Sequence, residues 1–402
     1  MSTRFILCVI VIFLHLVEIY AQRNGCSLTF PIKDDRNEPI ILKHHGKKYD
    51  LFIPEEGKIH LKSGESVSLF CPYTRNVLKQ SNNNFTEAIC MNKETLKVHN
   101  IQYPFNQLQC SAPAKGSIAF TNTRCGNNRG KIINIGYKIP DNNNWITLIE
   151  VCYDSNEGNA LYSQHVLYGE AIKYASSQKY RPSFQENGVI GNLTANSAYK
   201  QTNQKKVLVQ LLGSESLANK YLNKTSFLTR GHLAPDADFL FAGLQFTTYF
   251  FINTCPQWEA VNGGNWLGVE SMVRKVAESY QKPLRIITGS HGVLSLPDIN
   301  NNLQNIFLDT RGILPVPKFL WKIIYLESTK EGIALVSLND PFIKKISNEH
   351  ILCPDVCNEY GWISKKWKNI AKGYMYCCDI RILQKTVKTI PSLNIRSILR
   401  KI

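Results

Sequence analysis

Residues 225–270 read TSFLTRGHLAPDADFLFAGLQFTTYFFINTCPQWEAVNGGNWLGVE and decide the fold class of this 402-residue chain. Aromatic and β-branched residues fill Phe246–Asn253, which predicts a β-strand. After the turn-prone Asn262-Gly-Gly, apolar residues recur at spacings of three and four from Trp266 to Tyr280, which predicts a helix that buries one face. The stretch therefore predicts a strand, a polar loop and a helix, in that order.

The same stretch concentrates polar side chains with catalytic potential in a segment that is otherwise apolar enough to be core. They are Arg230, His232, Asn253, Gln257, Asn262 and Glu270. An imidazole titrates near neutrality and suits a general base, and an amide oxygen suits Mg²⁺, which keeps most of its water ligands. Structural explanations compete with this one. A lone histidine is more often structural, Asn262 is a common capping residue, and Glu270 can pair with Arg274 one turn later.

The spacing of these residues carries a resemblance to a known family. It reads Arg230-Gly-His232, then Asn253-x-x-Pro-Gln257-x-x-x-x-Asn262-x-x-x-Trp266-x-x-x-Glu270. This order resembles the signature of the ββα-metal DNA/RNA non-specific endonucleases. Further segments within residues 160–385 resemble the secreted nucleases of arthropod gut and saliva; they are His165–Gly169, Arg181–Phe184, Thr288–Gly289 and Val316–Lys322.

The resemblance implies an α+β fold, with a ββα-metal nuclease domain built on a central antiparallel sheet with flanking helices. It implies that His232 is the general base and that Asn262 is the direct protein ligand of Mg²⁺, with Mn²⁺ as an alternative ion. Glu270 and Gln257 are then expected to orient the water molecules on the metal.

The remaining residues of the resemblance have supporting or substrate-binding roles. Asn253 is expected to support the loop, and Arg230 to contact phosphates of double-stranded DNA or RNA through its planar guanidinium. Arg181 is a second candidate for phosphate contact. Because Arg181 precedes Pro182, a surface turn is the alternative explanation for it.

Thr229 is the departure from the family pattern, which usually has Asp before Arg-Gly-His. A carboxylate there adds negative charge near the metal and its waters, whereas threonine offers only a hydroxyl. Loss of one preorganised electrostatic group costs on the order of a hundredfold in rate. Asp236 and Asp238 lie close by in the sequence and are candidates to compensate.

The N-terminus indicates secretion. Arg4 precedes an apolar run, Phe5–Val17, and the small residue Ala21 follows soon after, so residues 1–21 are expected to be a signal peptide. The run is too short to remain as a membrane anchor. Asn84, Asn192 and Asn223 each begin an Asn-x-Thr sequon, so we expect glycosylation at these positions.

Cysteine usage agrees with an oxidising compartment. The sequence has 12 cysteines, and removal of Cys8 with the signal peptide leaves an odd number, so at least one is unpaired within the chain. We expect this to be Cys255, which has no cysteine at helical or hairpin spacing. The terminal group Cys353, Cys357, Cys377 and Cys378 is compatible with a zinc site, but adjacent cysteines in a secreted chain favour disulfides.

Length and cysteine density predict two domains. Six cysteines and short alternating segments occupy the first part, so residues 22–155 are expected to form a small, disulfide-stapled, β-rich domain. Residues 156–402 are expected to form the endonuclease-like domain. The formal charge of +16 favours a polyanionic partner, although Lys-rich surfaces also serve solubility alone.

Three functions are compatible with these features. The first is a secreted, Mg²⁺-dependent, sequence-nonspecific endonuclease for DNA and RNA, with activity reduced by Thr229. The second is a protein that binds nucleic acid tightly and cuts it little or not at all. The third is a secreted structural or host-interacting glycoprotein in which the motif is residual.

Overall fold

A computed structural model describes residues 25–402 except 33–35, 47, 141–143, 178–179 and 190–193. The predicted signal peptide and the sequon at Asn192 therefore lie outside the described residues. Asn84 and Asn223 are both exposed. Among the described residues, no helix has the length and apolar character needed to span a membrane.

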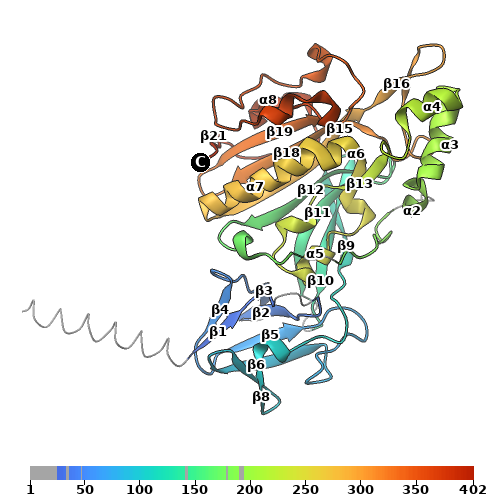
Figure 1. Ribbon diagram of the computed structural model, residues 1–402. Helices are drawn as coiled ribbons and strands as arrows, with labels where there is room; N and C mark the ends of the chain where they lie inside the picture. The colour runs from blue at the N-terminus through green and yellow to red at the C-terminus, as the bar shows by residue number, and fades with distance from the viewer. Residues whose placement is uncertain (1–24, 33–35, 47, 141–143, 178–179, 190–193) are drawn as a thin grey trace, which may run out of the picture.

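The N-terminal part is built from two small antiparallel sheets (Figure 1). The larger sheet has six strands, in the spatial order β3 (Lys48–Leu51), β2 (Ile40–His45), β5 (Ser66–Phe70), β6 (Phe85–Asn92), β7 (Thr95–Val98) and β8 (Ile101–Pro104). The smaller sheet pairs β1 (Cys26–Thr29) with β4 (Lys58–Leu61), and a 3₁₀ turn, η1 (Phe105–Gln107), follows β8. Alternating burial along β4 and β7 is typical of strands with one face on a core.

A nine-stranded sheet forms the centre of the rest of the chain. Its spatial order is β20 (Met375–Cys378), β19 (Glu331–Leu338), β18 (Pro317–Leu326), β15 (Pro283–Val293), β12 (Asn159–Tyr168), β11 (Trp145–Asp154), β10 (Gly130–Lys138) and β9 (Ser117–Cys125). These strands are antiparallel, and β21 (Ser397–Ile398) adds to β19 in parallel. The predicted α+β class with a central antiparallel sheet is confirmed.

Helices cover both faces of the nine-stranded sheet. The long helix α7 (Leu267–Tyr280) lies across one face, and its buried residues share a core cluster with Ile286 and Ile324. The helix α8 (Ile380–Thr386) belongs to a second cluster with Ile287 and Ile323, on the opposite face. Successive strand residues point to opposite faces, so the two clusters are the two sides of one sheet.

The predicted domain boundary at residues 155/156 does not coincide with the division between the sheets. Strands β9, β10 and β11 lie before that boundary, yet they belong to the nine-stranded sheet. Cysteine density misplaced the boundary because the disulfide Cys125–Cys152 joins β9 to β11 inside the large sheet. The six-stranded sheet ends with β8, at Pro104.

The other disulfides follow the expected division of cysteines. Cys26–Cys90 and Cys71–Cys110 close the N-terminal part. Cys353–Cys378 and Cys357–Cys377 join the C-terminal loop to β20, which rules out the four-thiolate zinc site. Cys255 is a free, buried thiol, as predicted.

The predicted strand at Phe246–Asn253 is wrong. This segment is fully buried but forms the end of α5 (Ala242–Phe246), a short loop and a 3₁₀ turn, η4 (Phe251–Asn253). The strand is β14 (Thr254–Trp258), because its hydrogen-bond partner is β13 (Leu228–His232). The predicted helix is confirmed as α7.

The remaining elements are short and surround this unit. They are η2 (Ile172–Tyr174), α2 (Ala195–Ala198), α3 (Gln201–Leu212), α4 (Glu215–Tyr221), η3 (Asp236–Asp238), α6 (Glu259–Val261), the π-helical turn η5 (Asn262–Trp266), the hairpin β16 (Ser295–Pro297) and β17 (Leu303–Asn305), η6 (Asn348–His350), η7 (Lys365–Lys368) and η8 (Ile370–Lys372). In Figure 1, β13 and α6 lie next to the end of α7 that begins at Leu267.

The N-terminal sheets and the nine-stranded sheet meet around α5 (Figure 1). The carboxyl group of Glu38, only 1% exposed, accepts hydrogen bonds from the main-chain N–H groups of Ile32 (2.9 Å) and Ala242 (3.2 Å). Tyr137 on β10 donates to the carbonyl oxygen of Gly243 (2.6 Å) from the other side. Both parts of the chain therefore hold the helix that leads into β14.

A buried charged group joins the large sheet to α7. The Asp238 carboxylate contacts His165 Nε2 on β12 and Arg274 NH1 on α7, each at 3.0 Å. Lys322 on β18 is 1% exposed and donates to Thr288 Oγ1 at 2.6 Å. Burial alone raises the pKa of Asp238, but His165, Lys322 and Arg274 outweigh this and hold that pKa below its usual range.

Replacement of Glu38 tests the junction. Glu38→Ala leaves one buried and one partly buried N–H group without that acceptor, so we expect a loss of about 3 kcal/mol in the free energy of unfolding, measured by urea denaturation. Glu38→Gln keeps one acceptor oxygen and is expected to lose about half as much. An alanine variant as stable as the parent contradicts this account of the junction.

His165 predicts a pH dependence of stability. Burial lowers the pKa of His165 below 6.5, against the opposing effect of Asp238, so the unfolded chain takes up this proton first as the pH falls. Stability is therefore present above pH 6.5 and decreases below it, by at most about 1.4 kcal/mol per pH unit from this group. We expect His165→Gln to flatten the dependence between pH 6.5 and 5.5. The exposed His99→Gln serves as the control that leaves it unchanged.

Candidate active site

The pairing of β13 with β14 brings four of the predicted residues together. In the antiparallel register, Thr229 lies opposite Gln257, Gly231 opposite Cys255, and His232 opposite Thr254. Side chains alternate along a strand, so those of positions 230 and 232 share one face of β13. The motif Arg230-Gly-His232 therefore presents its arginine and histidine on the same side.

Gly231 is required by the packing of Gln257. A Cβ atom at position 231 would lie 2.0 Å from Cδ of Gln257, closer than any real contact. The Gln257 side chain is fully buried, and its Oε1 atom has no hydrogen-bond partner among the described residues. Gln257 thus lies beneath β13, with one acceptor atom still available.

His232 is set among aromatic rings. The centroids of Phe184 and Tyr249 each lie 5.0 Å from that of the imidazole, and Nε2 is buried without a hydrogen-bond partner in the described part of the chain. Burial lowers the pKa of His232 to about 4, with Asp236 opposing this effect and Arg181 adding to it. The imidazole is therefore neutral at neutral pH, the form that a general base needs.

Both the oxygen and the nitrogen of the Asn253 side-chain amide form hydrogen bonds with main-chain atoms. Its Oδ1 accepts from Ala234 N (3.0 Å), and its Nδ2 donates to the carbonyl oxygens of Ala234 (2.9 Å) and Thr248 (3.0 Å). Its own carbonyl oxygen accepts from Leu233 N (2.9 Å). These contacts fix the segment that follows His232, so the geometry fits the expected supporting role of Asn253.

Arg230 is held in place by rings and an amide. Its NH2 donates to Oδ1 of Asn196 at 2.9 Å, and its Nε is buried without a partner among the described residues. The guanidinium carbon lies between 5.4 and 5.7 Å from three ring centroids, those of Phe184, Tyr199 and Phe251. Cation–π contacts of this kind orient a guanidinium without neutralising its charge.

Asn262 begins the π-helical turn η5 and is half-buried. Its side chain makes no hydrogen bond with the residues that the structure describes. The turn is held by the neighbouring Asn265, whose Nδ2 donates to the carbonyl oxygens of Lys366 (3.0 Å) and Gly373 (2.7 Å). The amide oxygen of Asn262 is thus available as a ligand on a fixed turn.

Glu270 lies in the first turn of α7. Burial raises the pKa of Glu270 to about 7; Lys322 and Arg274 oppose this shift, and Asp238 and Asp236 add to it. In the described part of the chain Glu270 has no ion-pair partner. Arg274 pairs instead with Asp238, so the structural explanation of Glu270 as a helix-surface ion pair is wrong.

The Thr229 hydroxyl donates a hydrogen bond to the carbonyl oxygen of Gln257 on the neighbouring strand, at 3.1 Å. Of the two nearby acids, Asp238 is committed to His165 and Arg274. Asp236 is half-buried and accepts from the Tyr249 hydroxyl at 2.7 Å. Its charge acts on both His232 and Glu270, so Asp236 is the acid that lies toward the candidate site.

The donor set fits a hard divalent cation. The amide oxygen of Asn262 and the carboxyl group of Glu270 are oxygen ligands of the kind that Mg²⁺ prefers. A separate group that could share an ion, Asp355 with Cys357 and Cys377, is excluded because both sulfur atoms are in a disulfide. Among the described residues, Asn262 and Glu270 remain the candidates for holding an ion.

The sequence analysis did not single out the groups behind the site. Lys322 and Tyr249 take part in its electrostatics only because of tertiary contacts, and Asp238 was named only as a neighbour of Thr229 in sequence. The sequence does mark Lys322, because it is a charged residue within a stretch of β18 that is otherwise apolar and buried. A lysine in such a run indicates a buried partner.

The chain is similar in sequence to known salivary proteins. The chain is 30% identical over 374 residues to a salivary endonuclease of Lutzomyia longipalpis, covering 91% of this chain and 84% of that protein. It is 25% identical to the salivary protein Tsal2A of Glossina morsitans morsitans, covering 93% and 94%. It is 24% identical to a salivary endonuclease of Culex quinquefasciatus, covering 83% and 81%.

The family match covers the candidate site and all strands of the large sheet except β9 and β21. Residues 128–381, from the β9–β10 turn to the start of α8, match the family described as DNA/RNA non-specific endonuclease. This range contains the paired strands, the π-helical turn and α7. The chain therefore belongs to the DNA/RNA non-specific endonuclease family.

Proposed function

We propose that this chain is a secreted, Mg²⁺-dependent endonuclease that cuts DNA and RNA without sequence preference. The observation that carries the proposal is the neutral imidazole of His232, with a buried, unpartnered Nε2 on the same strand face as Arg230. The names of two salivary endonuclease relatives support the same activity. Their salivary origin and the five disulfides support secretion.

The residues divide the work of phosphodiester hydrolysis. His232 takes the proton from the attacking water, and Arg230 and Arg181 hold the phosphate. Asn262 would hold the cation, and Glu270 and Gln257 would orient the water molecules around it. When bound, Mg²⁺ supplies positive charge against the charge that develops on the phosphate oxygens.

Lack of sequence preference follows from the kind of contact. The candidate substrate-binding groups are cations suited to phosphates, and phosphate contacts carry no sequence information. The net charge of +16 adds a long-range attraction that is common to DNA and RNA. Double-stranded DNA and RNA are therefore both expected substrates.

A second candidate function is tight nucleic-acid binding with little cleavage. The observation that favours it is Thr229, whose hydroxyl is bonded to the carbonyl oxygen of Gln257 and supplies no negative charge. The cationic groups remain in this case, so binding persists while catalysis is slow. Cleavage measurements on variants at positions 232 and 229 decide between the two candidates.

Removal of the base tests the endonuclease proposal. The purified chain is expected to cut plasmid DNA and double-stranded RNA with Mg²⁺ and to stop when a chelator is added. His232→Ala is expected to lower the cleavage rate about a thousandfold, because general-base catalysis contributes on that order. The exposed His60→Ala is the matched control and should retain full activity. Absence of metal-dependent cleavage at high protein concentration rules out the enzyme.

Restoration of the carboxylate tests the role of Thr229. Thr229→Asp is expected to raise the cleavage rate at saturating substrate, by up to about a hundredfold, because it returns one preorganised charge. Thr229→Asn has the same shape without the charge and is expected to give no such gain. Equal rates for the Asp variant and the parent contradict the argument from the missing carboxylate.

A further inference from the structure

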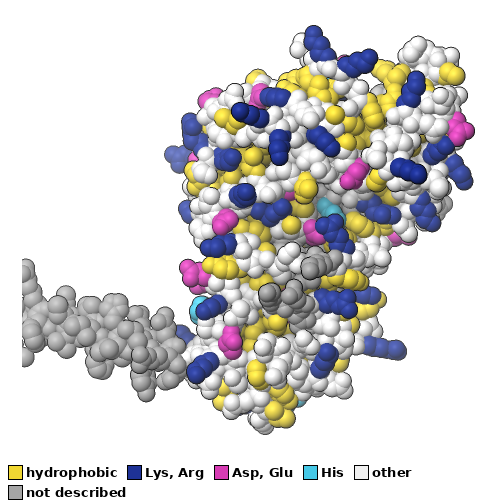
Figure 2. Space-filling model, viewed as in Figure 1, with side chains coloured by type: hydrophobic (Ala, Val, Ile, Leu, Met, Phe, Trp, Pro, Cys, Tyr) yellow, Lys and Arg dark blue, Asp and Glu magenta, His cyan; other side chains and the backbone are white. Residues whose placement is uncertain are grey.

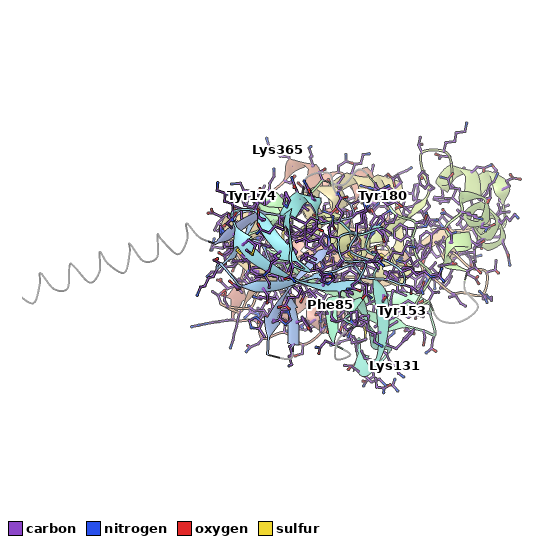
Figure 3. The ribbon with its side chains drawn as sticks, turned by 90° about the horizontal axis from the view of Figure 1, so that it is seen from below. Phe85, Lys131, Tyr153, Tyr174, Tyr180 and Lys365 are labelled. Carbon is purple, nitrogen blue, oxygen red and sulfur yellow. A yellow bond between two sulfur atoms is a disulfide. The ribbon has the colours of Figure 1, made fainter. Side chains whose placement is uncertain are left out.

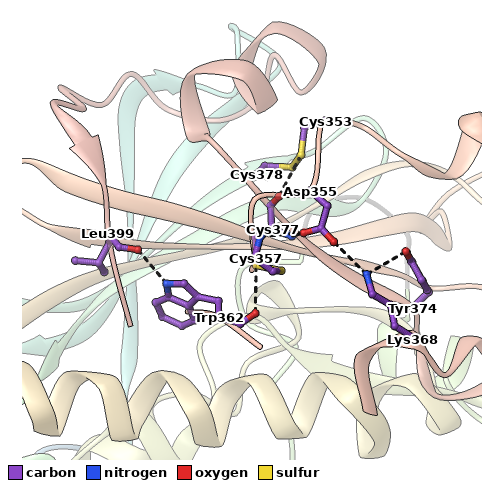
Figure 4. The surroundings of a disulfide bond; sticks show 9 residues. All are labelled: Cys353, Asp355, Cys357, Trp362, Lys368, Tyr374, Cys377, Cys378 and Leu399. Carbon is purple, nitrogen blue, oxygen red and sulfur yellow. Dashed lines mark hydrogen bonds and ion pairs between the residues drawn. A yellow bond between two sulfur atoms is a disulfide. The ribbon is translucent and has the colours of Figure 1, made fainter. Parts of the chain in front are cut away.

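The C-terminal segment beside the candidate metal turn is strongly basic. Residues 363–373 contain four exposed lysines and no acidic residue. One of them, Lys368, is neutralised by Asp355 (3.0 Å) and also contacts the Tyr374 hydroxyl (3.2 Å; Figure 4). The other three have no ion-pair partner among the described residues, and we name them the lysine strip: Lys365, Lys366 and Lys372.

The main chain that carries the strip is fixed. The disulfide Cys357–Cys377 closes the loop, and Trp362 donates from Nε1 to the carbonyl oxygen of Leu399 at 2.9 Å (Figure 4). Trp367, in the middle of the strip, is only 4% exposed. The strip is therefore a set of exposed side chains on an anchored main chain.

The same segment contacts both sides of Asn262. Asn265 binds the carbonyl oxygens of Lys366 and Gly373. A Cβ atom on Gly264 would lie 2.8 Å from the carbonyl oxygen of Lys372, and one on Gly373 would lie 2.8 Å from Cγ1 of Val261. The strip thus begins at the turn that presents the candidate metal ligand.

One lysine of the strip lies on the same side of the molecule as the residue that precedes the candidate phosphate contact Arg181. In Figure 3, Lys365 and Tyr180, the neighbour of Arg181, lie on the same side, whereas Lys131 lies on the opposite side. Over the face seen in Figure 2, Lys and Arg side chains outnumber Asp and Glu side chains. A long anion held at the candidate site therefore has further cations available on this surface.

We propose that the lysine strip binds the phosphate backbone of a nucleic-acid duplex outside the catalytic centre and so extends the active site. The inference rests on the proposed function and assigns the residues that bind the nucleic acid beyond the catalytic centre. A duplex carries about one negative charge per 1.7 Å of its axis, which matches a row of uncompensated ammonium groups. Ammonium groups act as point charges, so the strip contributes affinity without sequence preference. A protein partner is less well matched, since a segment with uncompensated lysines and no acidic residue favours a polyanion.

The salt dependence of binding tests the strip. Binding of a short fluorescent DNA duplex is measured with a chelator present, so that cleavage does not interfere, at salt concentrations from about 50 to 200 mM. For Lys365→Gln/Lys366→Gln/Lys372→Gln we expect the slope of log affinity against log salt to become shallower by about 2 to 3, and the affinity to fall at least tenfold at the lower salt. The matching Arg substitutions are expected to restore the slope.

The matched control removes three charges elsewhere. The control residues are Arg124, Lys131 and Lys388, which line two adjoining surface cavities on the side of the molecule where Lys131 lies. Replacement of all three by Gln changes the net charge by the same amount as the strip variant. This control is expected to keep the parental slope. An unchanged slope in the strip variant, or an equal change in the control, overturns the proposal. Absence of duplex binding by the parent instead overturns the proposed function.

Discussion

The buried carboxylate of Asp238 is the interaction on which the arrangement of the site depends. It receives His165 from the large sheet and Arg274 from α7, and it follows β13 by only a few residues. A buried charge is costly unless it is paired, so the sheet, the helix and the segment after His232 are held at one relative position. The positive charge of buried Lys322 also favours the ionised form of Asp238, and its ammonium group donates a hydrogen bond to Thr288.

The N-terminal sheets take part in positioning the site, because they support α5. The Glu38 carboxyl binds the first N–H of that helix, and Phe30 packs edge-on against Phe241 with centroids 4.6 Å apart. Residues after α5 include Tyr249, beside His232, and Asn253, which fixes the loop behind it. One core cluster runs through both parts, so the N-terminal part and the nuclease part share their packing.

The candidate metal turn is fixed from the other end of the chain. Asn265 binds two carbonyl oxygens of the C-terminal segment, and two disulfides hold that segment against β20. The C-terminal loop, about a hundred residues further along the chain, thus meets the π-helical turn, which follows β14 after the short helix α6. The lysines of that loop are placed beside the turn by the same contacts.

The sequence by itself determined the family signature, the period of α7, the free thiol of Cys255 and the disulfides of the C-terminal loop. These depend on spacing and residue type, which are properties of the chain alone. Only the tertiary structure decided that Phe246–Asn253 is buried without being a strand, since its aromatic residues satisfy a core in any backbone conformation, whereas a strand needs a hydrogen-bonding partner. It also decided that β9–β11 belong to the large sheet and that Lys322 and Asp238 lie behind the site, because strand pairing and charge pairing join residues whose separation in sequence carries no local signal.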